Sequence, residues 1–304
     1  VGYLRVWRLY SRSLKNTFMK IGMLGIQTGI THLSVFAERS IGFRYLSPGY
    51  VGAMNYAKSV TELPRVLLLS SILTTTYARQ IKLKSEDENE YLSYTLRMNE
   101  LLGTLALIGQ CFSIVFAPFI LIVIYQRGAF TSDDIKVTFD IYQILTLGFM
   151  PGLMFGFLLR IMLIDGQNKA MLRFSVVKTI TELFLMYVLV FQFSQGIPIA
   201  ITIGKFVIVG LLIFYFHRRL PGIINVRRFV VSSILLFMVS ALLIMLNRLL
   251  IDYFLTLLKW QLFALYTPLI ILFLYLTMKF LIRMHPDLLA VLPKFEFIRR
   301  IVRQ

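Results

Sequence analysis

The chain has 304 residues, of which 58% are hydrophobic and 15% charged, and its mean hydropathy is +0.75. This composition excludes an ordinary water-soluble domain and indicates a membrane protein with short polar loops. Basic residues outnumber acidic ones by 32 to 15, which in a polytopic membrane protein is typical of cytoplasmic loops rather than of a nucleic-acid partner. With one cysteine, Cys111, and three scattered histidines, we expect no disulfide within these residues, no metal and no cofactor.

Apolar stretches bounded by charged or turn residues predict about eight membrane helices, since about 20 apolar residues cross a bilayer. Their approximate limits are 17–37, 60–80, 98–125, 136–162, 171–193, 197–216, 228–248 and 256–281. The charge-free run 183–204 contains the turn residues 194–198 (SQGIP), which divide it into a tight hairpin. The sequence therefore predicts an all-α polytopic membrane protein.

Lysine and arginine are distributed unequally between the two sides of these helices. If residue 1 is cytoplasmic, most of the basic residues outside the spans fall on the cytoplasmic side. An even number of crossings then places both termini in the cytoplasm.

Local signals mark two of the predicted helices. Thr131 is suited to cap the fourth helix, with Asp133 and Asp134 in its first turn. The small-residue stripes Gly148-Gly152-Gly156, around Pro151, and Gly25-Gly29 predict close helix packing. The alternative for the first stripe is a kink at Pro151 that moves during a transport cycle.

Catalytic motifs are missing from the sequence, which contains no nucleophile elbow, no phosphate-binding glycine loop and no HExxH. Ionisable residues at membrane depth are more informative, because they usually face a cavity or a partner. Lys178 and Glu182 are four residues apart and can pair on one helix face, and His32 and Arg39 also share a face. Basic groups around a hydrated cavity would suit an anionic substrate such as a phosphate. The candidate cavity cations are Arg39, Lys58, Lys178 and Lys205, and the candidate coupling or charge-pair residues are Glu38, Glu182 and Asp140.

Four motifs then occur in order. Residues 46–57 (LSPGYVGAMNYA), followed by Leu63-Pro64, resemble the segment between the seventh and eighth helices of the MurJ/MviN lipid II flippase family. Residues 127–131 (RGAFT) resemble the family's external loop between helices nine and ten. The turn 165–169 (DGQNK) and the region 196–204 occupy the expected later places, so the resemblance covers roughly residues 20–220. The last two helices match only by position and hydrophobicity.

The resemblance implies the multidrug/oligosaccharidyl-lipid/polysaccharide exporter superfamily, whose members have two six-helix lobes around a cavity that opens alternately to either side. On that map, residues 1–220 are the second lobe, and residues 221–304 are two additional helices and a basic cytoplasmic tail. Because the first lobe and a starting Met are missing, we expect the C-terminal part of a longer protein, with the other lobe in cis. A half-sized protein that needs a partner chain is the alternative.

The implied function is translocation of a polyprenyl-diphosphate-linked saccharide, such as lipid II, across the bacterial inner membrane by alternating access, with membrane lipid around its tail. The family's cavity-facing basic residue falls at Ser59 in strict register, whereas Lys58 lies one residue earlier, and Pro198 stands where the family usually has glycine. The Glu38-Arg39 pair resembles the acidic-Arg pair that ends the family's seventh helix. An O-antigen or exopolysaccharide precursor flippase, a drug exporter of the same superfamily, a membrane-embedded transferase using His32 and Glu38, and a non-transporting scaffold remain alternatives.

Overall fold

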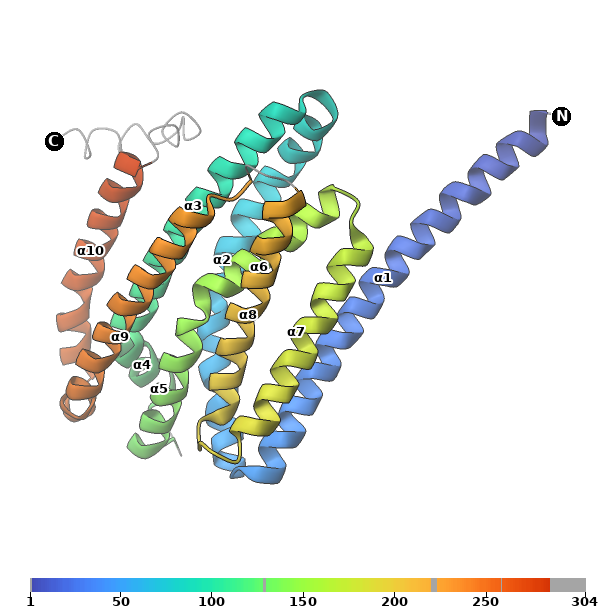
Figure 1. Ribbon diagram of the computed structural model, residues 1–304. Coiled ribbons are helices and arrows are strands. Elements are labelled where there is room, and N and C mark those ends of the chain that lie inside the picture. Colours follow the sequence, from blue (N-terminus) through green and yellow to red (C-terminus); the bar gives the residue numbers. More distant parts are fainter. Residues whose placement is uncertain (1, 128–129, 220–222, 258, 285–304) are drawn as a thin grey trace.

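The computed structural model describes residues 2–127, 130–219, 223–257 and 259–284, and the regular secondary structure in these ranges is helical throughout (Figure 1). The helices are α1 (Gly2–Tyr45), α2 (Pro48–Glu86), α3 (Glu88–Val115), α4 (Ala117–Tyr125), α5 (Ser132–Leu147), α6 (Phe149–Ile164), α7 (Asn168–Leu189), α8 (Gly196–Arg219), α9 (Val226–Thr256) and α10 (Lys259–Met284). The predicted basic tail and two residues of the RGAFT segment, Gly128 and Ala129, lie outside the described residues.

The eight predicted spans correspond to single helices, except that the third is divided into α3 and α4 and the fourth into α5 and α6. Both divisions lie just before a proline. A proline has no N–H to donate, and its ring crowds the carbonyl four residues earlier. For Pro151 that residue is Leu147, where α5 ends. At the second break Gly148 adds backbone freedom, and α5 and α6 are bent by 46° relative to each other. The backbone is therefore bent near Pro151, where a kink was the alternative to close packing of the glycine stripe.

The hairpin predicted within the run 183–204 is confirmed, because α7 ends at Leu189 and α8 begins at Gly196. The turn is so tight that a Cβ atom at position 196 would lie 2.2 Å from the carbonyl oxygen of Leu189. Only glycine fits this approach. The Thr131 cap is confirmed as well: its hydroxyl accepts from the Asp134 N–H, and the Asp134 carboxylate accepts from the Thr131 N–H at 2.8 Å.

Length and composition identify α3, α8, α9 and α10 as helices able to cross a membrane, and the bent α5–α6 pair as a fifth, among the described residues. The prediction of an all-helical polytopic membrane protein is confirmed. Helices α1, α2 and α7 are not in this set, and they are the ones that carry most of the ionisable residues described below. Such charges are tolerated in a bilayer where they face protein or a hydrated cavity.

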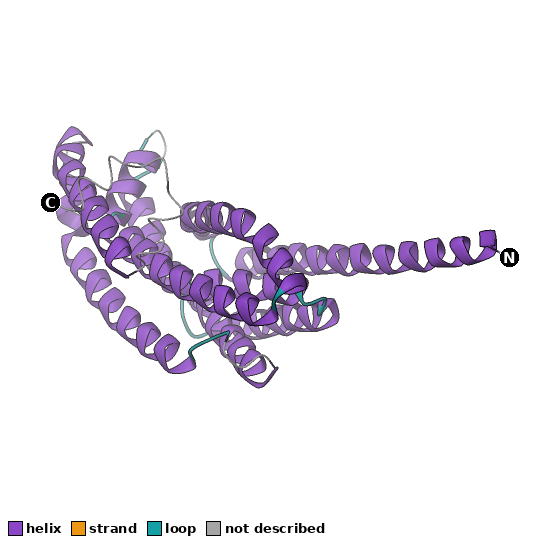
Figure 2. Cartoon of the chain, turned by 90° about the horizontal axis from the view of Figure 1, so that it is seen from above, coloured by secondary structure: helices purple, strands orange, loops and turns teal. Residues whose placement is uncertain are grey.

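Helix α1 packs against α7 and α2, α7 packs against α8, and α2 packs against α5. The N-terminal half of α1 extends away from the other helices, as Figures 1 and 2 show. Helices α9 and α10 lie on the opposite side of the bundle, against α3, α4 and α5. In the glycine stripe of α1, a Cβ atom added at Gly25 or Gly29 would meet no described atom of another helix within 4 Å, so the close packing predicted for this stripe does not occur in the described part of the chain.

Candidate functional site

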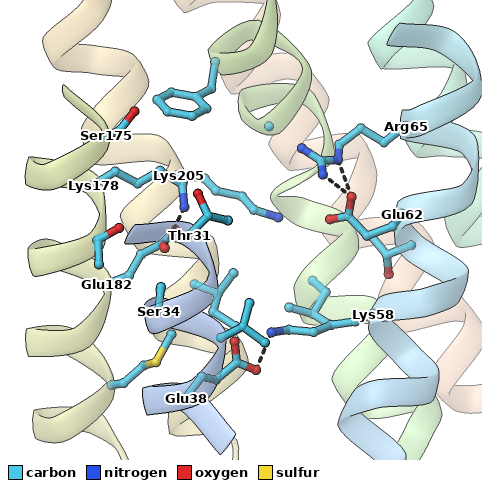
Figure 3. Close-up of a pocket in the computed structure, with 18 of the residues that line it drawn as sticks. Thr31, Ser34, Glu38, Lys58, Glu62, Arg65, Ser175, Lys178, Glu182 and Lys205 are labelled. Carbon is cyan, nitrogen blue, oxygen red and sulfur yellow. Dashed lines mark hydrogen bonds and ion pairs between the residues drawn. The ribbon is translucent and has the colours of Figure 1, made fainter. Parts of the chain in front are cut away.

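A cavity of about 410 Å³ lies between α1, α2, α7, α8 and the α5–α6 pair (Figure 3). Its wall contains four basic and three acidic side chains together with hydroxyl groups and an amide. The ionisable and polar lining residues are Gln27, Thr31, Ser34, Glu38, Lys58, Thr61, Glu62, Arg65, Ser175, Lys178, Thr179, Glu182 and Lys205. Such a concentration of charge at membrane depth is expensive and marks a functional site by default.

Helical periodicity explains how three helices contribute these groups. On α1 the polar positions 27, 31, 34 and 38 recur every three or four residues. Positions 58, 61, 62 and 65 on α2 and positions 175, 178, 179 and 182 on α7 follow the helical pattern i, i+3, i+4, i+7. Residues at this spacing lie on one helix face. Each helix therefore turns a narrow polar stripe toward the cavity.

Three carboxylates of the cavity are each paired with a basic side chain. Lys58 of α2 donates to the buried carboxylate of Glu38 in α1, a contact that joins two helices. Within α2, Arg65 donates through Nε to Oε2 of Glu62 at 2.7 Å.

The third pair lies within α7, where Nζ of Lys178 is 2.7 Å from Oε2 of Glu182. Each carboxylate of the cavity is thus neutralised by a cation of the protein itself. Among the described residues, no group of three or more His, Cys, Asp or Glu side chains is arranged to hold a metal ion.

Lys205 of α8 is the remaining cation of the cavity, and within the described residues it makes no hydrogen bond or ion pair. Its side chain crosses the cavity toward α2, between the pairs of α7 and α2 (Figure 3). An ammonium group without a counterion at membrane depth is unfavourable unless water or an anionic ligand solvates it. The arrangement therefore leaves one net positive charge available to an anion.

Glycines make room for these charged side chains. A Cβ atom at Gly148 would lie 3.0 Å from Cδ of Lys205, and one at Gly152 would lie 3.5 Å from Cδ of Arg65. Two glycines of the stripe predicted for helix packing thus lie under the stems of two cavity cations. A third glycine, Gly204, lies against Glu182 in the same way.

The structure brings five of the predicted site residues together around this cavity: Glu38, Lys58, Lys178, Glu182 and Lys205. It also distinguishes Lys58 from Ser59. Lys58 faces the cavity, whereas Ser59 is exposed and donates its hydroxyl to the carbonyl of Asn55.

Three residues considered from the sequence lie elsewhere. Arg39 is exposed on α1 and does not line the cavity, and His32 is exposed on the same helix. Asp140 of α5 forms an ion pair with Arg248 of α9 at 3.2 Å, outside the lining. The Asp140–Arg248 ion pair joins α5 to α9.

Glu62 and Arg65 also line the cavity, although they are not among the site residues predicted from the sequence. The signal was present in the sequence, because they follow Lys58 by four and seven residues and so share its face of α2. Arg65 adds the fourth basic side chain to the cavity.

A family model described as lipid II flippase MurJ matches residues 5–295. No curated protein matches the chain. Among solved structures, one titled "Lipid II flippase MurJ, inward closed conformation" is similar with a TM-score of 0.59 and 17% sequence identity, covering 81% of this chain and 53% of that chain. This likeness shows a shared fold, and the chain spans about half the length of the solved protein.

Proposed function

Because the chain belongs to the MurJ lipid II flippase family, we propose that its cavity binds the diphosphate of a polyprenyl-linked saccharide, lipid II first among them, and carries it across the bacterial inner membrane. Flippases of this kind are transporters, so the chain is not an enzyme. No bond of the substrate needs to be made or broken in this process.

The surplus positive charge at Lys205 is the observation that carries the proposal. A diphosphate offers several anionic oxygens, and hydrogen bonds between such oxygens and basic groups are strong where water is scarce. Lys58, Arg65 and Lys178 surround the same space and already hold carboxylates, so each can exchange its carboxylate partner for a phosphate oxygen. When no substrate is bound, the three carboxylates keep the total charge of the cavity close to zero.

An apolar groove of about 340 Å³ between α6, α8 and α9 suits the polyprenyl tail. Pro151, Phe206 and Phe229 are among its lining residues. In this proposal the headgroup crosses through the polar cavity while the tail stays in apolar surroundings, which avoids exposing a long hydrocarbon to water. Alternating access supplies the movement.

The proposal assigns residues 1–220 to the second lobe of a two-lobe transporter and residues 221–304 to two additional helices with a cytoplasmic tail. The first lobe, in cis or as a partner chain, would cover the face of α1 on which Phe18, Leu33 and Phe36 are exposed and Gly25 and Gly29 are open. Both termini of the chain would be cytoplasmic, as the distribution of lysine and arginine indicates.

The test uses the intact gene in a flippase-depleted strain and the purified product in vesicles that contain lipid II. We expect Lys58→Ala and Lys205→Ala to abolish complementation and lipid II translocation at unchanged abundance. Arg39→Ala is the contrast, since it removes an exposed cation that does not line the cavity. Full activity of both cavity variants would overturn the proposal. Translocation of another polyprenyl-diphosphate saccharide in place of lipid II would support the same site with a different sugar.

A further inference from the structure

Helix α9 carries polar residues at a regular spacing in an otherwise apolar helix. Ser233, Ser240 and Asn247 follow one another at intervals of seven residues and so lie along one face. Ser240 and Asn247 are buried. Because buried polar groups in a membrane need hydrogen-bonding partners, this stripe indicates specific contacts to the lobe.

Two of the three contacts of this stripe are made next to helix breaks of the lobe, and the third is made to Gln110 within α3. Asn247 donates to the carbonyl of Ile114, in the last turn of α3 before the break that precedes α4. Ser240 accepts a hydrogen bond of 2.9 Å from Nε2 of Gln110 in α3. Ser233 donates to the sulfur of Met150 at 3.8 Å, in the first turn of α6.

Gln110 connects Ser240 to the backbone of the bend between α5 and α6. Its Oε1 accepts from the backbone N–H of Met150 at 3.3 Å. This N–H is one of the first-turn donors that no carbonyl of α6 can satisfy, because a helix begins with unpaired N–H groups. A backbone N–H can only donate, so the Gln110 amide has a single orientation in which its NH₂ group reaches Ser240.

The same bend forms part of the cavity wall. Gly148 and Gly152, on either side of Met150, lie against the side chains of Lys205 and Arg65. Gln110 itself and Ser240 do not line the cavity. A substitution outside the cavity that changes the bend would therefore move the surface against which Lys205 and Arg65 lie.

We propose that Gln110 and Ser240 are positioning residues: through the amide of Met150 they hold the α5–α6 bend and thereby the places of Lys205 and Arg65. Helix α9 is on this account a part of the translocation machinery and not only a boundary of the apolar groove. The inference rests on the proposed function, since it assigns these cations to the substrate.

The experiment measures the bend directly, in the full-length protein in which Cys111 and any cysteine outside these residues are replaced by alanine. A reporter thiol is introduced by Phe155→Cys, on the α6 part of the wall, or by Ser34→Cys, on the α1 part. The rate of maleimide labelling is compared among Ser240→Ala, Gln110→Leu and Ser240→Thr. Ser232→Ala is the matched control, because its hydroxyl makes no hydrogen bond within the described residues.

Loss of one hydrogen bond corresponds to about two- to tenfold in an equilibrium. We expect a labelling change of that size at position 155 in Ser240→Ala and Gln110→Leu, recovery in Ser240→Thr, and no change at position 34. Equal rates at position 155 in all variants would overturn the inference. If Gln110→Leu does not accumulate in the membrane, the milder Ser240→Ala and its rescue by Ser240→Thr decide the question.

Translocation measured in parallel separates this inference from the proposed function. If the labelling rate at position 155 changes in Ser240→Ala while Lys58→Ala and Lys205→Ala remain active in translocation, the positioning role stands and the proposed function fails. If labelling does not respond while Lys205→Ala is inactive, the proposed function stands and the positioning role is wrong.

Discussion

Glu182 of α7 lies directly against Gly204 of α8, so that a Cβ atom at position 204 would be 2.5 Å from Cγ of the glutamate. The absence of a side chain at Gly204 thus makes room for the glutamate whose carboxylate pairs with Lys178 at 2.7 Å. The contact between two neighbouring helices sets the geometry of one charge pair in the cavity.

Gly204→Ala is therefore expected to displace Glu182 and to lower both translocation and thermal stability. Overpacking of this kind costs about 1–3 kcal/mol. Gly103→Ala in α3 is the matched change, because its Cβ would meet only the terminal methyl of Met154 at 3.9 Å. Thermal unfolding of the purified protein and vesicle translocation check the prediction, which fails if the two alanine variants behave alike.

Lys205→Gln is expected to reduce translocation without reducing stability. On the proposed function the lysine binds the diphosphate. It is half-buried and has no counterion among the described residues, so its removal relieves an unfavourable charge. A lost hydrogen bond to a charged group corresponds to about a 10- to 100-fold change in binding. Diphosphate-lipid binding and the melting temperature are the two measurements. Lys169→Gln, which removes an exposed cation on α7, is the control. A fall in melting temperature with unchanged binding would assign Lys205 a structural role instead.

The Glu38–Lys58 pair is expected to show a large coupling energy in a double-mutant cycle of Glu38→Gln and Lys58→Met. Each single change leaves a partner unsatisfied and should lower the free energy of unfolding by about 1.5–3 kcal/mol, while the double variant loses less than the sum. The exposed Lys82–Glu86 pair, 3.8 Å apart, serves for comparison. Surface pairs contribute about 0–1 kcal/mol. Strict additivity at Glu38 and Lys58 would show that their contact does not stabilise the protein.

Asp165→Asn is expected to loosen the corner between α2 and α3. Asp165 lies in the α6–α7 turn, its buried Oδ1 is 3.0 Å from Nζ of Lys84, and it accepts from the hydroxyl of Tyr91 at 3.3 Å. Removing its charge weakens both contacts across three helices. Hydrogen exchange of residues 84–91 should accelerate, whereas Glu86→Gln, at an exposed position of the same corner, should leave it unchanged. The reverse order of effects would contradict the role given to Asp165.

Sequence periodicity determined much of this architecture. Turn chemistry and helical spacing suffice to predict features that depend on interactions within a few residues. These features are the turn at residues 194–198, the cap at Thr131 and the Lys178–Glu182 pair. The charge of the cavity was visible for the same reason, because Lys58, Glu62 and Arg65 recur on one face of α2.

The tertiary structure decided which of these faces meet. The partner of Glu38 is twenty residues away, that of Asp140 is on α9, and the glycines at 148 and 152 lie against side chains of α8 and α2. Helical spacing tells which residues share a face but not which helix that face contacts. Helix geometry separates Lys58 from Ser59 by about 100° around α2. The packing of α2 against α1 and α5 decides that Lys58 faces the cavity and that Ser59 is exposed. The same packing leaves Arg39 on the outer face of α1.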